Sequence, residues 1–308
     1  MSATLASAGA AVACAHADRA GAAITDALAF AEQQQTAALA HAKRCVVQIG
    51  IFDRESRKLL DMGSGALLED GRILSAAHVF DQLVDPQQQA VLVATFAGEQ
   101  ERPQWAFTAQ LLTPPDLLER GLLPGVRVDL AVARITGSIT CYPPCFQGLA
   151  SLADCTYEVT EESPAPSDGF DARVRGLACV GADGRLPHLT CDREFMAAAE
   201  AGPNSRVTVV GYPVAVGSHV HADSGDVLTM ENGFLRTRAF IESASSGGPA
   251  INDAGAIVGV VSFDFARADA HRCSYLRSVH LLTEQHFGVA PPLPPAAAPA
   301  AAAGGEAS

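Results

Sequence analysis

Apolar and polar residues follow a strand-like pattern in the first half of the chain, which divides into short apolar runs. Val, Ile, Leu and Phe dominate these runs, as in β-strands, and the hairpin turn signal Asp70-Gly71 separates two of them. We expect strands at residues 45–52, 65–69, 72–76, 90–96, 104–113 and 128–135. The pattern predicts a six-stranded antiparallel unit over residues 44–136.

A second series of apolar runs repeats this organisation over residues 206–288, with a short C-terminal helix for which Ser278 is a candidate cap. Its expected strands are 206–213, 226–230, 234–242, 249–253, 256–263 and 272–279. Many short strands separated by turn signals are typical of β-sandwiches and barrels. Because the two units have similar sizes, we predict an all-β fold of two six-stranded antiparallel β-barrels side by side.

The alanine-rich extension over residues 1–43 has a helical pattern instead. Its apolar positions recur near helical spacing at Ile24, Leu28, Ala31 and Leu39, which predicts an amphipathic N-terminal helix. Such a helix packs on the main domain or binds a regulatory partner, and the sequence leaves both roles open.

Residues 137–205 carry a weaker pattern, which we interpret as a linker or insertion between the barrels. An acidic, proline-bearing run in it predicts a solvated loop, and Asp183-Gly184 predicts the turn of a hairpin. The sequence leaves four roles open for this segment: it covers the cleft, acts as a regulatory lid, binds a regulatory partner or decorates the surface. Residues 289–308 form a Pro/Ala-rich tail with too little hydrophobic variety to pack, so we expect it to be disordered.

Composition narrows the classes of partner. The 308 residues carry a formal net charge of −13, which argues against nucleic acid or an anionic membrane as a partner. No apolar run approaches the roughly 18 residues of a membrane span. The N-terminal stretch lacks the basic region and apolar core of a secretory signal, which favours a cytoplasmic location.

Eight cysteines leave three chemical states open: free thiols, disulfides such as one between Cys179 and Cys191, or a metal site. The spacings within the group Cys141, Cys145 and Cys155 match no common zinc motif. A metal-dependent enzyme using cysteines with His188 or His221 has no ligand spacing to recommend it. We therefore expect no metal or cofactor.

Three short motifs carry residues that could catalyse acyl transfer. Ser246 lies on a glycine-proline turn in "SASSGGPAIND", His78 ends "GRILSAAH" and Asp129 precedes the apolar run "LAVARI". A serine hydroxyl becomes a nucleophile only with a base within hydrogen-bond reach and a third group that orients the base. Taken singly, a structural role is favoured for His78, as a core histidine bonded to a carbonyl, and for Asp129, as an aspartate that begins a strand, and Ser246 could be a turn serine.

Taken together, these motifs resemble the trypsin-like serine peptidases of the chymotrypsin fold, similar to bacterial HtrA-type proteases and glutamyl endopeptidases. The resemblance extends from about Cys45 to about Phe287 and rests on "GSGALLEDGRILSAAHV", "DLAVARI", "VTVVGYP" and "SSGGPAINDAGAIVGVVS", which follow one another in the family's order. It implies an active site in the cleft between the barrels, no PDZ domain within this chain, and a protein or peptide as the substrate.

The same resemblance implies a role for each residue. His78 is the general base, Asp129 orients it and Ser246 is the nucleophile. The backbone N–H groups of Ala244 and Ser246 form the oxyanion hole. Substrate-cleft residues are then Phe240, Ile241, Ser262, Phe263 and Asp264.

One departure from the family keeps two functions open. Ala244 stands where the family has glycine, and a Cβ there costs roughly 1 kcal/mol or more if φ is positive. Ser245 replaces the aspartate of trypsin-like zymogens, so activation by an inserted N-terminus is not expected. The first function is a serine endopeptidase that forms an acyl-enzyme. The alternative is a catalytically inactive trypsin-like domain that serves as a peptide-binding or scaffolding module.

Overall fold

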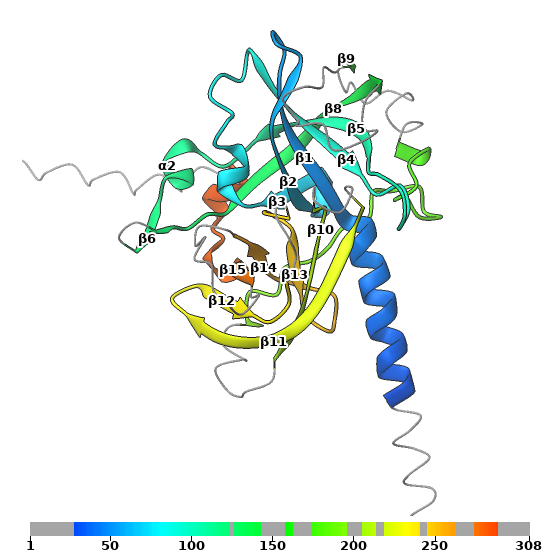
Figure 1. Ribbon diagram of the computed structural model, residues 1–308, viewed down its shortest axis with the longest axis vertical. Coiled ribbons are helices and arrows are strands. Elements are labelled where there is room, and N and C mark those ends of the chain that lie inside the picture. Colours follow the sequence, from blue (N-terminus) through cyan, green and yellow to red (C-terminus); the bar gives the residue numbers. More distant parts are fainter. Residues whose placement is uncertain are drawn as a thin grey trace, which may run out of the picture.

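The computed structural model describes residues 28–123, 126–142, 158–162, 174–195, 205–213, 219–240, 245–262 and 274–288. Antiparallel β-structure dominates and forms two bodies, one above the other in Figure 1, with a helix projecting from them. The predicted all-β fold with two barrels is confirmed, and every strand predicted within the two units has an observed counterpart.

The first barrel closes through an extra strand pairing. Its strands are β1 (Val46–Asp53), β2 (Lys58–Leu67), β3 (Arg72–Ser75), β4 (Gln89–Thr95), β5 (Gln104–Leu111) and β8 (Ala131–Tyr142). They follow the order β3-β2-β1-β4-β5-β8, and β3 also pairs with β8. The predicted turn joins β2 to β3, with φ of 59° at Asp70 and 68° at Gly71. Positive φ at both central residues is the geometry that Asp-Gly hairpin turns adopt.

The second barrel is a closed sheet in the order β10-β11-β12-β15-β14-β13. Its strands are β10 (Arg206–Gly211), β11 (His221–Glu231), β12 (Phe234–Thr237), β13 (Pro249–Ile251), β14 (Ile257–Val261) and β15 (Ser274–Ser278). It is the lower body in Figure 1.

Short elements connect the strands. They are η1 (Glu69–Gly71), η2 (Ala77–Phe80), α2 (Pro115–Leu118), β6 (Gly121–Leu123), β7 (Val126–Arg127), η5 (Val279–Leu281) and η6 (Glu284–Phe287). The predicted C-terminal helix takes the form of the two 3₁₀ turns η5 and η6. Ser278 caps η5 as predicted, because its Oγ accepts a hydrogen bond of 3.4 Å from the His280 backbone N–H.

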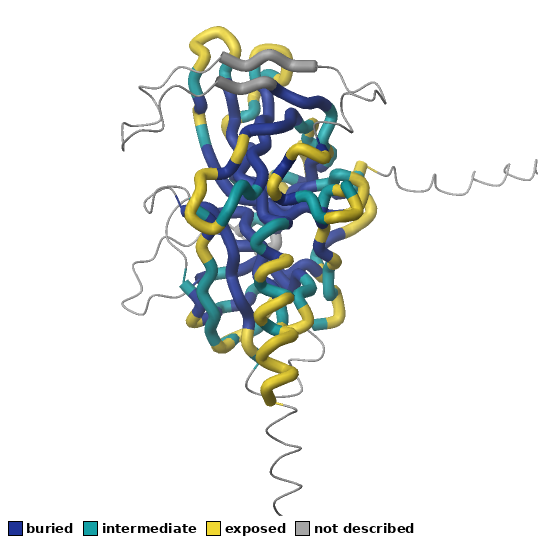
Figure 2. The backbone as a smooth tube through the Cα atoms, turned by 90° about the vertical axis from the view of Figure 1, so that its right-hand side faces the viewer, coloured by how far each residue is buried: buried dark blue, intermediate teal, exposed yellow. Residues whose placement is uncertain are grey.

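Buried apolar side chains join the two barrels into one body. The largest hydrophobic cluster includes Ile49 of β1, Leu74 of β3 and Ile257 of β14, so it crosses the boundary between barrels. In Figure 2 the dark blue, buried backbone runs through both halves. Each barrel also has its own smaller cluster, around Trp105 in the first and Leu235 in the second. The shared core fixes the relative position of the loops at the boundary.

The N-terminal helix spans residues 28–45 of the described chain and leads directly into β1. Leu28 and Phe30 are 62% and 61% exposed, whereas Ala42 and Cys45 are buried. Figure 2 shows the exposed portion in yellow beyond the body. The predicted helix is confirmed over residues 28–45, and Ile24 of its predicted apolar stripe lies outside the described residues. Leu39 packs against the shared core and Gln35 donates to Asp253 Oδ1 at 3.1 Å, so the C-terminal half of the helix packs on the barrels.

Two predictions within residues 137–205 are wrong. The segment 174–195 forms turns and one isolated parallel β-bridge, between Cys191 and Ile257, and its two halves do not pair as a hairpin. Gly184 does lie in a turn, where its N–H donates to the Gly181 carbonyl (3.1 Å). The apolar residues Leu177 and Leu189 of this segment enter the shared core, so burial and not strand pairing explains their pattern. The acidic run contains strand β9 (Glu158–Glu162), which extends the first sheet beside β8.

Candidate active site

His78 lies at the end of the β2–β3 hairpin, on η2. The neighbouring residues Ala77, Val79 and Phe80 are buried and anchor this turn in the core. The His78 side chain is 22% exposed and therefore reaches solvent from a fixed backbone. The sequence places it there because the buried strand β3 ends at Ser75, whose hydroxyl donates to the Ser64 carbonyl (2.7 Å).

Asp129 lies two residues before β8 and is fully buried. Its φ of 54° is in the left-handed region, which aspartate tolerates better than most residues. Its Oδ1 accepts the His78 backbone N–H at 2.9 Å, and the His78 Nδ1 lies 3.0 Å from Oδ1 and 2.9 Å from Oδ2. The carboxylate thus contacts both the backbone and the ring of the histidine.

A third group reaches the same carboxylate from the second barrel. Ser262, directly after β14 and 1% exposed, donates its Oγ–H to Asp129 Oδ2. The Ser262 backbone N–H donates to the Tyr275 carbonyl on β15 (2.9 Å), which fixes the serine. Asp129 therefore links the two barrels at the site.

Opposing effects act on the pKa of Asp129. Burial raises it, because a charged carboxylate is poorly solvated in the interior. The hydrogen bond from His78, the positive charge of the protonated ring and the Ser262 hydroxyl outweigh burial, so the pKa lies below its ordinary value. Asp129 is therefore ionised at neutral pH.

Ser246 lies in the turn between β12 and β13 and is 9% exposed. Its carbonyl accepts the Ser64 backbone N–H at 2.7 Å, so the turn contacts the first barrel. The N–H of Gly247 donates to the Val261 carbonyl (2.8 Å) and that of Gly248 to the Ser245 carbonyl (2.8 Å). Gly247 has φ of 85°, and a Cβ there would lie 2.1 Å from Ser75 Oγ and 2.2 Å from the Ser64 carbonyl oxygen. Only glycine fits this turn.

The turn that carries Ser246 and the 3₁₀ turn η2, which carries His78, both approach Gly63 of β2. A Cβ on Gly63 would lie 2.6 Å from Val79 Cγ2 and 3.0 Å from the Ser246 carbonyl oxygen. The structure thus brings the regions around His78, Asp129 and Ser246 together at the boundary between barrels. These three residues come from three separate parts of the sequence.

Of the other predicted cleft and oxyanion-hole residues, the structure describes only Phe240. Phe240 is partly buried, and its backbone N–H donates to Asp223 Oδ2 (2.7 Å). Ile241, Ala244, Phe263 and Asp264 lie outside the described residues. The cleft roles predicted for Phe240, Ile241, Phe263 and Asp264, and the oxyanion-hole role predicted for Ala244, remain predictions.

Sequence reasoning missed Asp61, a partly buried carboxylate on β2. Its only signal is a lone acid within the apolar run "KLLDMGSGALL". It also missed Ser64, whose Oγ accepts the Tyr212 backbone N–H (2.9 Å) and so joins the barrels next to Ser246.

The described residues contain no candidate for a metal centre or a membrane helix. No group of three or more His, Cys, Asp or Glu side chains among them could hold a metal ion. Within the same ranges, no helix is long and apolar enough to cross a membrane. Cys45, Cys179 and Cys191 are free thiols, so no disulfide joins Cys179 to Cys191.

Comparisons with known proteins bear on the family. No curated protein sequence matches the chain. The crystal structure of the serine endoprotease from Yersinia pestis aligns over 79% of this chain and 62% of its own, with 18% identity and a TM-score of 0.45. The crystal structure of Deg5 aligns over 80% of this chain and 90% of its own, with 16% identity and a TM-score of 0.48. This chain therefore spans less than two thirds of the Yersinia structure.

The sequence model of the trypsin-like peptidase domain matches residues 63–260, which is most of the two barrels. The matched range includes His78, Asp129 and Ser246. The chain belongs to the family of trypsin-like peptidase domains and has the chymotrypsin-like fold that its motifs predicted.

Proposed function

We propose that this protein is a serine endopeptidase that hydrolyses peptide bonds of protein substrates through Ser246, His78 and Asp129. The observation that carries the proposal is the contact between His78 Nδ1 and the buried Asp129 carboxylate, at 2.9 Å and 3.0 Å from its two oxygens. Asp129 is fully buried and accepts hydrogen bonds from both the backbone and the ring of one histidine. Burying its charge costs free energy, so a role in stability alone does not explain this arrangement.

The Asp129 contact selects the form of the histidine that a base requires. With Nδ1 donating to an ionised carboxylate, the lone pair of the neutral ring lies on Nε2. Nε2 then takes the proton of the Ser246 hydroxyl as the oxygen attacks the substrate carbonyl carbon. The negative charge of Asp129 stabilises the imidazolium that forms.

The remaining steps follow from the same groups. The tetrahedral intermediate collapses to an acyl-enzyme when His78 gives its proton to the leaving amine. Water, deprotonated by His78, then attacks the ester on Ser246 and releases the acid. Backbone N–H groups of Ser246 and Ala244 stabilise the oxyanion in both halves, and losing one such donor typically costs on the order of 10²–10³ in rate.

Labelling with a fluorophosphonate tests the proposal, because this reagent reacts only with an activated serine. We expect covalent labelling of the purified protein at Ser246, and no labelling of the Ser246→Ala or His78→Ala variants. Intact mass measurement gives the stoichiometry, and circular dichroism establishes that each variant is folded. A folded wild-type protein that remains unlabelled would support the alternative of an inactive peptide-binding module.

A further inference from the structure

Asp61 lies on the face of β2 that is turned toward the candidate active site. Two residues further along the strand, a Cβ on Gly63 would meet Val79 of η2 and the Ser246 carbonyl oxygen. Side chains two apart in a strand share a face. The β1–β2 register is regular from Asp61 to Gly63, with Asp61 opposite Ile51 and Gly63 opposite Ile49, and the bulge of this ladder lies outside that stretch, between Ile51 and Phe52. The Asp61 side chain therefore projects on the side where His78 and Ser246 meet.

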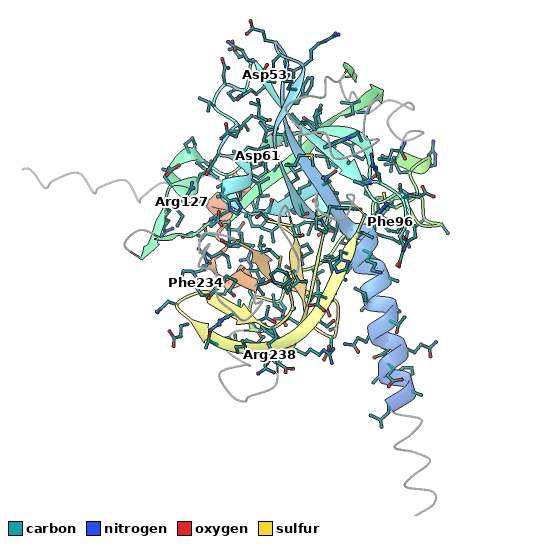
Figure 3. The ribbon with its side chains drawn as sticks, viewed as in Figure 1. Asp53, Asp61, Phe96, Arg127, Phe234 and Arg238 are labelled. Carbon is teal, nitrogen blue, oxygen red and sulfur yellow. The ribbon has the colours of Figure 1, made fainter. Side chains whose placement is uncertain are left out.

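The Asp61 carboxylate has no cationic partner within the described part of the chain. The backbone N–H of its neighbour Met62 donates to Asp61 Oδ1 at 2.7 Å. Asp81, the nearby acid on the segment after η2, differs in this respect. Two Arg127 nitrogens hold Asp81, at 3.0 Å and 2.8 Å. Figure 3 labels Asp61 and Arg127 on the same side of the upper barrel.

Electrostatics agree with this placement. Burial raises the pKa of Asp61, the Met62 N–H and the positive charge of His78 lower it, and Asp81 raises it, with a net increase. Asp61 thus lies within electrostatic range of the catalytic ring but is not bonded to it. A partly desolvated carboxylate of this kind gains by meeting a cation.

We propose that Asp61 is a specificity-determining residue that binds a lysine or arginine side chain of the substrate, one or two residues after the scissile bond. The proposal rests on the proposed function, since it assigns a subsite to the same catalytic centre. The negative charge of the Asp61 carboxylate is the property that selects the substrate.

The direction of the substrate follows from the chemistry of His78. The ring gives its proton to the leaving amine, so the segment after the scissile bond passes beside His78. A carboxylate near that ring, on a strand that also holds the Ser246 carbonyl, faces the leaving segment. Lysine and arginine reach such a group through long side chains and donate charge-assisted hydrogen bonds to it.

Internally quenched peptides test the proposal on the intact chain. The peptides share one sequence before the scissile bond and carry Lys, Ala or Glu at the first or second position after it. We expect kcat/KM to be about tenfold higher for the better lysine peptide than for its alanine counterpart, the effect of one charged hydrogen bond. In Asp61→Asn this preference falls to less than twofold, because kcat/KM falls more for the lysine peptide than for the alanine peptide.

Asp70→Asn is the matched control. It removes the same charge beyond the opposite end of β2, at a turn residue with positive φ that asparagine also tolerates. We expect it to keep the full lysine preference. Asp61→Lys provides a second variant, in which the glutamate peptide becomes the better substrate.

The outcomes separate this proposal from the proposed function. Cleavage of all peptides with equal kcat/KM by the wild-type protein overturns the role of Asp61 and leaves the endopeptidase intact. An equal loss for lysine and alanine peptides in Asp61→Asn also overturns it, because Asp61 would then act on His78 and not on the substrate. Absence of cleavage together with absence of fluorophosphonate labelling overturns both.

Discussion

The two barrels contribute to the candidate active site by different physical means. The first barrel supplies His78 and Asp129, which side-chain hydrogen bonds and charge hold together. The second supplies Ser246, whose position depends on backbone hydrogen bonds and on a glycine that no other residue can replace. Electrostatic interactions therefore hold the His78–Asp129 pair in place, whereas steric fit of the backbone turn positions the nucleophile Ser246.

This difference implies that the two halves fail differently. We expect a substitution at His78 or Asp129 to change the proton affinity or the tautomer of the imidazole and to leave the barrel folded. A substitution in the turn of Ser246 moves the backbone and affects stability as well as rate. The hydrogen bond from Ser262 to Asp129 is the point where the second barrel acts on the electrostatics of the first.

The largest expected effect on rate comes from removing the nucleophile Ser246 or the base His78. Ser246→Ala and His78→Ala should each lower kcat by about 10⁵–10⁶, and the double variant should lose no more than either single one, because the two residues act as a unit. Steady-state kinetics of the three variants measure this. Multiplicative losses in the double variant would show that His78 and Ser246 act independently, contrary to the mechanism.

Asp129→Asn comes next, with an expected fall in kcat of about 10³–10⁴, because an amide stabilises the wrong tautomer of His78. The effect should lie in kcat and not in KM, since Asp129 is fully buried and does not reach the substrate. Thermal unfolding serves as a control for the fold. A variant that keeps more than a tenth of wild-type kcat would contradict the assigned role.

Gly247→Ala tests the steric half. The new Cβ would clash with Ser75 Oγ and the Ser64 carbonyl oxygen at a φ of 85°, so we expect a loss of stability of about 3 kcal/mol or more. Gly71→Ala is the matched control: its φ is 68° but its nearest neighbour would be 3.7 Å away, so only about 1 kcal/mol is expected. Urea unfolding measures both. Equal losses would mean that conformation alone, not the contact with the first barrel, requires glycine at 247.

The sequence predicted those parts of the molecule that depend on local pattern. Each strand of the two units overlaps its predicted position, because alternation and turn residues such as Asp70 are local properties, although β2 begins seven residues earlier and β8 ends seven residues later than predicted. The pattern failed between residues 174 and 191, where Leu177 and Leu189 are apolar because they enter the shared core. Periodicity records burial, and it does not distinguish a strand face from a turn packed in a core.

The candidate site divides in the same way. His78, Asp129 and Ser246 each lie in a recognisable local motif, so they could be named before the structure. Asp61 could not, because its place beside His78 arises from the packing of β2 against η2 and has no signature within its own strand. Long-range packing, which a single sequence does not display, supplies that part of the site.

The smallest expected effect concerns a contact between the C-terminal segment and the first barrel. His286 of η6 is 1% exposed; its Nδ1 accepts the Thr283 N–H (3.1 Å), and its carbonyl accepts the Thr113 hydroxyl (3.0 Å). Burial is the largest effect on the pKa of His286 and lowers it, and the positive charges of Arg120 and Arg193 lower it further. The unfolded chain therefore binds more protons than the folded one just below the ordinary histidine pKa of about 6.5.

Stability should accordingly be complete above that pH and fall as the pH decreases from 6.5 toward the lowered pKa of the folded state, by about 1.4 kcal/mol for each unit of the shift. In His286→Gln this contribution disappears, so the free energy of unfolding should change less between pH 7 and pH 5, while kcat at pH 7 stays close to wild type. Urea unfolding of both proteins at several pH values measures the difference. Parallel pH profiles would contradict the assignment, because the carboxylates titrate alike in both proteins and only the histidine differs. A variant with reduced kcat at pH 7 would mean that this contact also positions the acid and base half, and the two halves would then be less independent than their hydrogen bonds indicate.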